Sequence, residues 1–130
     1  MDVRLKRVYE KPERGDGLRV LVDRLWPRGL SRQAARIDRW AKELAPSSEL
    51  RRWYSHDPAR WSEFRRRYAR ELAAIPDITG SLARASRRKT LTLLYASRDP
   101  HHNNAVALAG YLMRQGGIRS RPNRRRENPS

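Results

Sequence analysis

Two short apolar runs stand out from a chain that is otherwise rich in charged residues. Residues 18–22 read Leu-Arg-Val-Leu-Val, and residues 90–95 read Thr-Leu-Thr-Leu-Leu-Tyr. Runs of this length and composition predict buried strands. Residues 3–9 alternate apolar with basic side chains, which predicts a first strand with one half-exposed face.

Apolar residues at intervals of three and four predict helices between the strands. The first set is Ile37, Trp40, Ala41 and Leu44, and Pro46 ends this expected helix. Next, Ser47 or Ser48 can cap a short helix.

A longer helix is expected after Asp57, because an aspartate followed by a proline is a strong helix start signal. Its apolar face holds Trp61, Phe64, Tyr68 and Leu72. Such an aromatic stripe favours a place in the core over a base-stacking surface. A proline at position 76 ends this helix, and one further short helix is expected before the basic residues 87–89.

The run 90–95 leads into a polar loop and then into a last helix. Asn103 or Asn104 can cap that helix. The loop would then lie at a helix amino terminus, where backbone N–H groups and the helix dipole attract anions. The whole pattern predicts an α/β fold, with a small, mostly parallel sheet and helices packed around it.

We expect a single domain over residues 1–116 and a disordered tail over residues 117–130. A chain of 130 residues is long enough for one core but not for two. The tail carries five arginines and one acidic residue, Glu127, and contains nothing to bury.

Composition limits the classes of partner. The net charge of +16 points to polyanions such as nucleic acid. Only four of the 30 basic residues are lysines, and an arginine codon bias in a GC-rich genome would give the same skew without any partner. The chain contains no cysteine, no run near the roughly 20 apolar residues of a membrane span and no signal-peptide segment, so we expect a cytoplasmic protein without membrane contact.

The polar residues that follow the two apolar runs are the candidate site residues. Ligands of open α/β sheets bind beyond the carboxyl ends of the strands, and arginine suits phosphate or carboxylate groups. We therefore predict an anion-binding rim in which the ligand-binding residues are Arg24, Trp26, Arg28, Ser97, Arg98 and Asn103. Asp23 and Tyr95 are the candidates for a catalytic role, as a general base and a proton donor.

A structural interpretation of the same residues stays open. Asp23 and Arg24 could form an ion pair, Trp26 could fill the core, and Pro27 with Gly29 could simply make a turn. No phosphate loop, nucleophile elbow or dinucleotide fingerprint is present. The adjacent His101 and His102 would point about 100° apart on a helix, so neither a metal site nor a cofactor is predicted.

Several of these stretches together resemble the YeaO-like family of small bacterial proteins, a domain of unknown function (DUF488). They are residues 6–9, residues 16–29 with the signature Leu-Trp-Pro-Arg-Gly at 25–29, residues 91–95, and Asn103 ahead of Ala105. The resemblance covers roughly residues 3–114. It implies a compact single-domain fold with a site formed by these motifs, and it names no reaction.

Two features depart from that family pattern. Asn104 stands where the resemblance leads us to expect a histidine, and the arginine-rich tail would lie beyond the family domain. The first departure weakens the case for a base at that position.

Three functional hypotheses follow from the sequence. The rim could bind a phosphate-bearing small molecule or a nucleotide, as an enzyme or as a binding domain. The chain could instead bind nucleic acid through its basic tail. In the third hypothesis it is an adaptor whose Trp-Pro-Arg-Gly loop docks a partner. The location of any affinity, at the rim or in the tail, distinguishes the first two.

Overall fold

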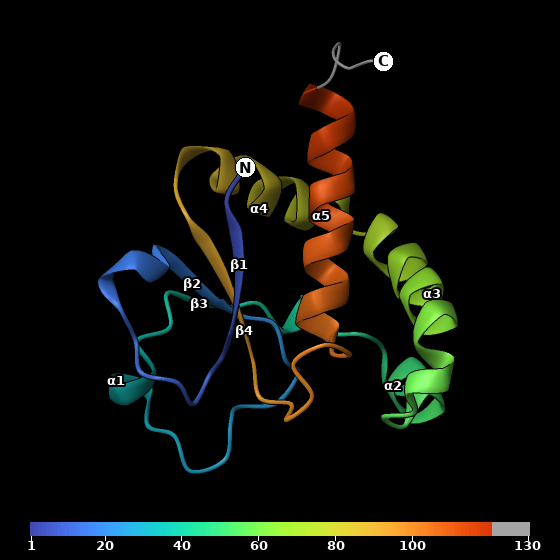
Figure 1. Cartoon of the computed structure of the whole chain (residues 1–130), viewed down its shortest axis with the longest axis horizontal. Coiled ribbons are helices and arrows are strands. Elements are labelled where there is room, and N and C mark those ends of the chain that lie inside the picture. The colour runs from blue at the N-terminus through green and yellow to red at the C-terminus, as the bar shows by residue number, and fades with distance from the viewer. Residues whose placement is uncertain (121–130) are drawn as a thin grey trace.

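A four-stranded parallel sheet lies at the centre of the fold, in a computed structural model that describes the backbone of residues 1–120 and the side chains of residues 1–115 (Figure 1). The strands are β1 (Val3–Arg7), β2 (Leu18–Leu21), β3 (Arg39–Trp40) and β4 (Leu91–Tyr95), in the order β1-β4-β2-β3. The predicted α/β fold with a mostly parallel sheet is confirmed. The two apolar runs form the adjacent central strands β2 and β4, so the loops that follow them leave the same edge of the sheet.

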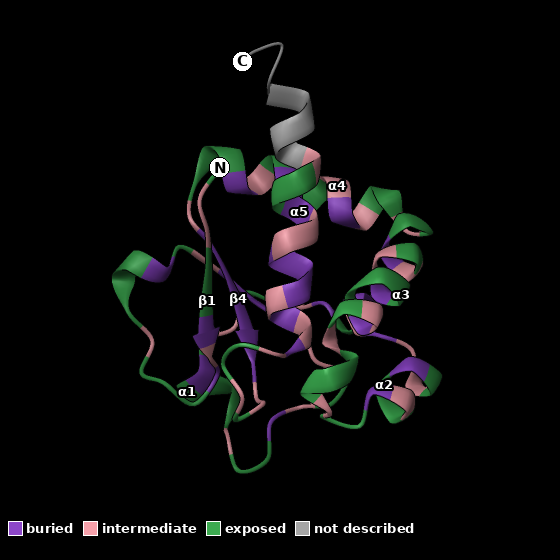
Figure 2. Ribbon diagram, turned by 45° about the vertical axis from the view of Figure 1, so that its right-hand side comes forward, coloured by how far each residue is buried: buried purple, intermediate pink, exposed green. Residues whose placement is uncertain are grey.

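Four helices cover one face of the sheet: α2 (Ser48–Tyr54), α3 (Trp61–Ala73), α4 (Pro76–Arg88) and α5 (Asn104–Ser120). Val20, Leu91 and Leu93 point from the strands into the core that these helices complete. All five residues of β4 are buried, because it has a strand on either side and both of its faces are covered (Figure 2).

The predicted helix starts agree with the structure. The Ser47 hydroxyl accepts a hydrogen bond from the Leu50 N–H, which caps α2. Asp57 caps a short 3-10 helix, η3 (Pro58–Arg60), that leads directly into α3. On α3, Phe64, Tyr68 and Leu72 are buried as expected from their spacing, and Trp61 is partly buried.

Loops rather than long helices cover the other face of the sheet. One half of this face is apolar: Leu21 and Leu94 pack with Val8 and with the partly buried Trp26 and Trp40. The single-turn helix α1 (Arg32–Ala35) lies on this side, in the connection that leads from β2 to β3 along the chain.

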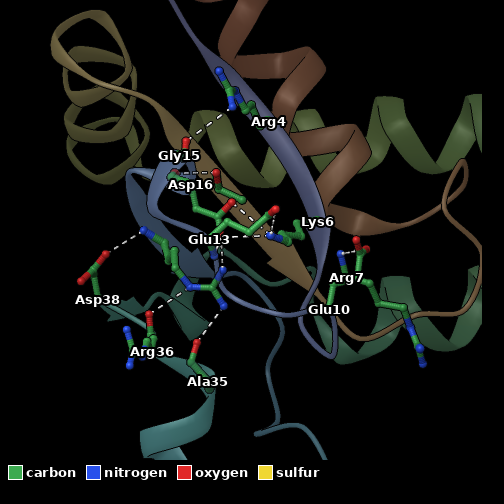
Figure 3. A network of polar contacts seen from close by, with 12 residues as sticks. Arg4, Lys6, Arg7, Glu10, Glu13, Gly15, Asp16, Ala35, Arg36 and Asp38 are labelled. Atoms are coloured by element: carbon green, nitrogen blue, oxygen red, sulfur yellow. Dashed lines mark hydrogen bonds and ion pairs between the residues drawn. The ribbon is translucent and has the colours of Figure 1, made fainter.

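The other half of that face is a buried ionic cluster (Figure 3). The Lys6 ammonium contacts Asp16 at 3.1 Å and Glu13 at 2.8 Å, and Asp16 also pairs with Arg19 at 2.5 Å. Asp16 belongs to the 3-10 helix η1 (Arg14–Asp16) between β1 and β2. On β1, Lys6 is buried because Glu13 and Asp16 cover its ammonium group, whereas Leu5 points to the opposite face of this edge strand and is 40 % exposed.

The helix expected over residues 37–44 is not formed, and this prediction was wrong. Instead, the chain forms β3 and then a 3-10 helix, η2 (Lys42–Leu44). The Ala41 N–H bonds the Leu21 carbonyl, which keeps the segment extended beside β2. Ile37 and Trp40 pack on one face of the sheet, whereas Ala41 and Leu44 enter the helical core on the other. These four residues are therefore spaced as in a helix, although they lie in a strand and a turn and pack in two separate apolar clusters.

The last helix is longer than expected. Asn103 caps it by accepting a hydrogen bond from the Val106 N–H at 3.0 Å, and α5 then continues to Ser120. The predicted tail over residues 117–130 therefore begins inside a helix, and its residues 121–130 lie outside the described part of the chain. Within the described residues, no helix has both the length and the apolar character that crossing a membrane requires.

Candidate functional site

A cavity of about 380 Å³ opens where the loops after β2 and β4 meet the end of α2. Its walls come from residues 23–28, from the loop 96–104 and from residues between β3 and α3. Six of the eight predicted site residues line it: Asp23, Arg24, Trp26, Arg28, Ser97 and Asn103. These six residues therefore lie around one cavity at the carboxyl edge of the sheet, and its binding of an anion stays a prediction.

Asp23 lies on the cavity wall without a cationic partner. Its Oδ2 atom accepts a hydrogen bond from the Ala96 N–H at 2.9 Å, and its Oδ1 atom accepts one from the Asn104 amide at 3.1 Å. Burial raises the pKa of the Asp23 carboxyl above its ordinary value and outweighs these two hydrogen bonds, which lower it. Among the described side chains, no lysine or arginine nitrogen lies within 4.0 Å of it, so the predicted ion pair with Arg24 is absent.

Asn104 holds the first turn of α5 against the end of β2. Its amide nitrogen donates to the Val22 carbonyl at 2.8 Å as well as to Asp23. A carboxamide does not gain or lose a proton as an acid or base near neutral pH. The side chain at this position, where a histidine was expected from the family pattern, therefore orients Asp23 without acting as a base.

Three arginines supply positive charge to the cavity: Arg24, Arg28 and Arg51. The Arg24 guanidinium donates to the Pro46 carbonyl at 3.0 Å, which fixes it across the cavity mouth. Arg28 and Arg51 are exposed, and within residues 1–115 neither of them pairs with a carboxylate. The Tyr9 hydroxyl donates to the Arg28 carbonyl at 2.8 Å and so positions the backbone that carries Arg28.

Aromatic side chains form the remaining wall. Trp26 donates its indole N–H to the Leu30 carbonyl at 2.6 Å and packs edge-on against Trp40 at 5.5 Å between ring centroids. The sequence allows Trp26 to be a core residue or a ligand-binding residue. The structure is compatible with both roles, because Trp26 belongs to the small apolar cluster and also lines the cavity. Tyr54 and Phe64, with ring centroids 4.5 Å apart, face the cavity from the helical side.

Several backbone N–H groups of the loop before α5 are bonded within the loop itself. One Asp99 oxygen accepts the N–H groups of His101 and His102 at 2.9 and 3.1 Å. The other lies 3.0 Å from the His102 ring. These contacts, led by the backbone hydrogen bond from His101, lower the pKa of Asp99. Asn103 caps the helix by accepting from the Val106 N–H, and the arginines carry the full positive charges of the site.

Two predicted site residues, Tyr95 and Arg98, lie outside the cavity lining, and Ser97 lines the cavity but is bonded within its own loop. Tyr95 is buried in the helical core and lies outside the cavity lining, and burial raises the pKa of its hydroxyl. Arg98 is exposed and also lies outside the lining. The Ser97 hydroxyl accepts a hydrogen bond from the Asp99 N–H at 3.2 Å, so Ser97 shapes the loop.

Sequence reasoning missed the contribution of α2. Arg51, Tyr54 and His56 reach the cavity from the end of this helix, where Ser55 and His56 have φ values of 47° and 54°. This left-handed turn ends α2, and the chain then continues into η3 and α3. Neither residue is glycine or asparagine, so no local signal in the sequence marks the turn.

Within the described residues, no group of three His, Asp or Glu side chains converges as a metal site would require. Asp99 and His102 form a pair, but no third such side chain joins them.

Comparisons with known proteins place the chain in a family. Residues 2–128 match the family DUF488-N3i, described as the inactive DUF488-N3 subclade. The chain is 40 % identical to the uncharacterized protein YeaO of Escherichia coli K12 over 112 residues, which are 86 % of this chain and 97 % of YeaO. It is also 42 % identical over 113 residues to the uncharacterized protein Rv3073c of Mycobacterium tuberculosis, covering 85 % of this chain and 92 % of that protein.

No solved structure matches the chain at a significant level. The family match extends to residue 128, so the arginine-rich tail is not beyond the family domain as expected from the sequence.

Proposed function

This chain belongs to the inactive DUF488-N3 subclade of the YeaO-like family, and we propose that it binds a phosphate-bearing small molecule in the rim cavity. The family description favours a binding protein over an enzyme. The observation that carries the proposal is the presence of three arginines around one cavity of about 380 Å³. Cavities of roughly 300–1,000 Å³ are typical of small-molecule sites.

The arginines suit a phosphate because each guanidinium presents N–H donors in a planar fork. Arg28 and Arg51 come from separate elements, one from the loop after β2 and the other from α2, and both line the cavity. Within residues 1–115 no carboxylate neutralises either of them. A dianionic phosphate monoester supplies the opposite charge that these two groups lack.

A thermal-unfolding titration of the full chain tests the proposal. The probes are inorganic phosphate, methyl phosphate, sugar phosphates and nucleotides. A specific ligand at a hundred times its dissociation constant should add about 2.7 kcal/mol to the free energy of unfolding. We expect Arg28→Ala and Arg51→Ala to remove most of this stabilisation.

Arg52→Ala is the matched control. Arg52 is exposed on the same helix as Arg51, lies outside the cavity lining and loses the same charge on substitution. The control should respond to the ligand like the wild type. Equal losses in all three variants would mean that net charge rather than the cavity attracts the anion, and the proposal would fail. An unfolded Arg28→Ala protein would assign that residue a structural role.

Nucleic-acid binding is the second candidate, and the net charge of +16 favours it. Nonspecific binding to phosphate backbones weakens steeply with salt concentration, whereas a bidentate contact in a cavity depends on it much less. Removal of residues 121–130 separates the two functions. If the tail carries the affinity, the truncated chain loses oligonucleotide binding and keeps its response to small phosphate esters.

A further inference from the structure

We propose that Asp23 forms a second subsite in the rim cavity, which accepts a hydrogen bond from a hydroxyl group of the ligand. The ligand class is then a phosphorylated sugar, either free or as part of a nucleotide. This inference rests on the proposed function, because the arginines must hold the phosphate while Asp23 reads the rest of the molecule.

The hydrogen bonds of Asp23 leave it acceptor capacity. A carboxylate offers about four acceptor positions, and within the described residues each oxygen of Asp23 accepts one hydrogen bond, from Ala96 or from Asn104. Both donors come from the segment after β4, and they line the same cavity as Asp23. A hydrogen-bond acceptor in a cavity that still has free lone pairs favours ligands with a donor at that position.

Asp23 has no cationic partner among the described residues, and this determines which group of a ligand it would bind. No lysine or arginine among the described residues lies within 4.0 Å of the Asp23 carboxylate, although three arginines line the same cavity. An all-anionic ligand would leave Asp23 beside like charge. A ligand with a phosphate at one end and neutral hydroxyl donors at the other satisfies both the arginines and the carboxylate.

The two donors also fix the carboxylate before the ligand arrives. Ala96 holds it through the backbone at the end of β4, and Asn104 holds it from the first turn of α5 while bonding the Val22 carbonyl. Pre-organised acceptors lose little freedom on binding, so their hydrogen bonds contribute more to affinity. Trp26 and Tyr54 also line the cavity and add apolar area to its walls.

Two phosphate monoesters test the subsite in the full chain: ribose 5-phosphate, and methyl phosphate, which carries the same charged group without hydroxyls. Isothermal titration should show that the wild type binds ribose 5-phosphate about tenfold or more tightly, since a hydrogen bond to a charged acceptor can supply that difference. Asp23→Asn should reduce the preference to near equality while methyl phosphate still binds. Asn104→Ala keeps the carboxylate but removes one of the two donors that orient it, so the preference should fall only part of the way.

A second measurement avoids any substitution at Asp23. With ¹³C-labelled aspartate, NMR titration should show that ribose 5-phosphate lowers the Asp23 pKa relative to the methyl phosphate complex, because a hydroxyl donor stabilises the ionised carboxylate. Adenosine 5′-monophosphate in the same titration distinguishes a free sugar phosphate from a nucleotide as the tighter ligand.

The outcomes separate the two claims. Equal affinity for both esters, or a preference that survives in Asp23→Asn, would overturn the hydroxyl subsite and leave the arginine site standing. Failure of both esters to bind the wild type would overturn the proposed function and this inference together.

Discussion

The Asp23 carboxylate accepts a hydrogen bond from the Ala96 N–H at 2.9 Å, and this contact joins the loops that leave the two central strands. The two residues are 73 positions apart in the chain. They meet because β2 and β4 are parallel neighbours whose carboxyl ends reach the same edge of the sheet. The same contact sets one wall of the cavity, so the fold and the candidate site share it.

The raised pKa of Asp23 predicts a particular pH dependence of stability. Between the ordinary value of 3.8 and the higher folded value, the folded protein holds more protons at this group than the unfolded chain does. The free energy of unfolding of the wild type should therefore fall, relative to Asp23→Asn, as the pH rises through that window. Urea unfolding of both proteins from about pH 3.5 to about pH 7.5 measures the difference.

Carboxyl groups with lowered pKa values, such as Asp16 and Asp99, act in the opposite direction, but both proteins share them and they cancel in the comparison. A difference that does not change with pH, or that grows in favour of the wild type, would show that Asp23 is not destabilised by ionisation.

Tyr9→Phe should weaken ligand binding with little cost to the fold. The Tyr9 hydroxyl donates to the Arg28 carbonyl, and this hydrogen bond is exposed. Its loss should reduce the free energy of unfolding by about 1 kcal/mol or less. The affinity for phosphate esters should fall because the backbone that carries Arg28 gains freedom. Titration and urea unfolding of the same sample compare the two effects, and unchanged affinity would show that Arg28 is positioned without Tyr9.

Gly17→Ala should destabilise the protein strongly. Gly17 has φ +64°, and a Cβ atom there would lie 2.3 Å from the backbone oxygen of Thr90. The clash would push apart β2 and β4, since the Leu18 N–H bonds that same oxygen at 2.9 Å. We expect a loss of at least about 1–3 kcal/mol.

Gly15→Ala serves as the control for Gly17, because the nearest side-chain atom to a Cβ there is 3.9 Å away. Thermal unfolding should show this control close to the wild type. Similar melting temperatures for the two variants would contradict the close approach of Gly17 to β4.

The stability lost on truncating an aromatic residue of α3 should increase with the burial of that residue. Phe64 is 2 % exposed and packs against Tyr54 and Tyr68, so Phe64→Ala should cost about 3–5 kcal/mol. Trp61 is only partly buried, and Trp61→Ala should cost less. Urea denaturation of both variants gives the order, and a larger loss for Trp61 would mean that the buried face of α3 is assigned wrongly.

The two central strands and part of the candidate site were predictable because their signals are local. Buried parallel strands appear as continuous apolar runs, as in residues 18–22 and 90–95, and the residues that follow such runs lie at the ligand-binding edge. Asp23 and Arg28 were found in this way.

The contribution of Arg51 was not predictable by the same reasoning. The spacing of apolar residues on α2 identifies the buried face of the helix, but not which neighbour its exposed side chains approach. That depends on contacts with residues distant in sequence, such as the hydrogen bonds from Tyr54 to the His102 carbonyl and from Ser47 to Glu71. Similarly, the burial of Lys6 depends on Asp16, which only the folded connection between β1 and β2 brings near.

The most direct test of the central claim is an NMR titration of the ¹⁵N-labelled full chain with ribose 5-phosphate, following backbone amides and arginine Nε–H signals. We predict saturable shifts at Arg24, Arg28 and Arg51 and in the loop amides of residues 96–104, with Arg52 unchanged. Shifts confined to other arginines, or no saturable shift at the cavity, would contradict an anion-binding site at the carboxyl edge of the sheet.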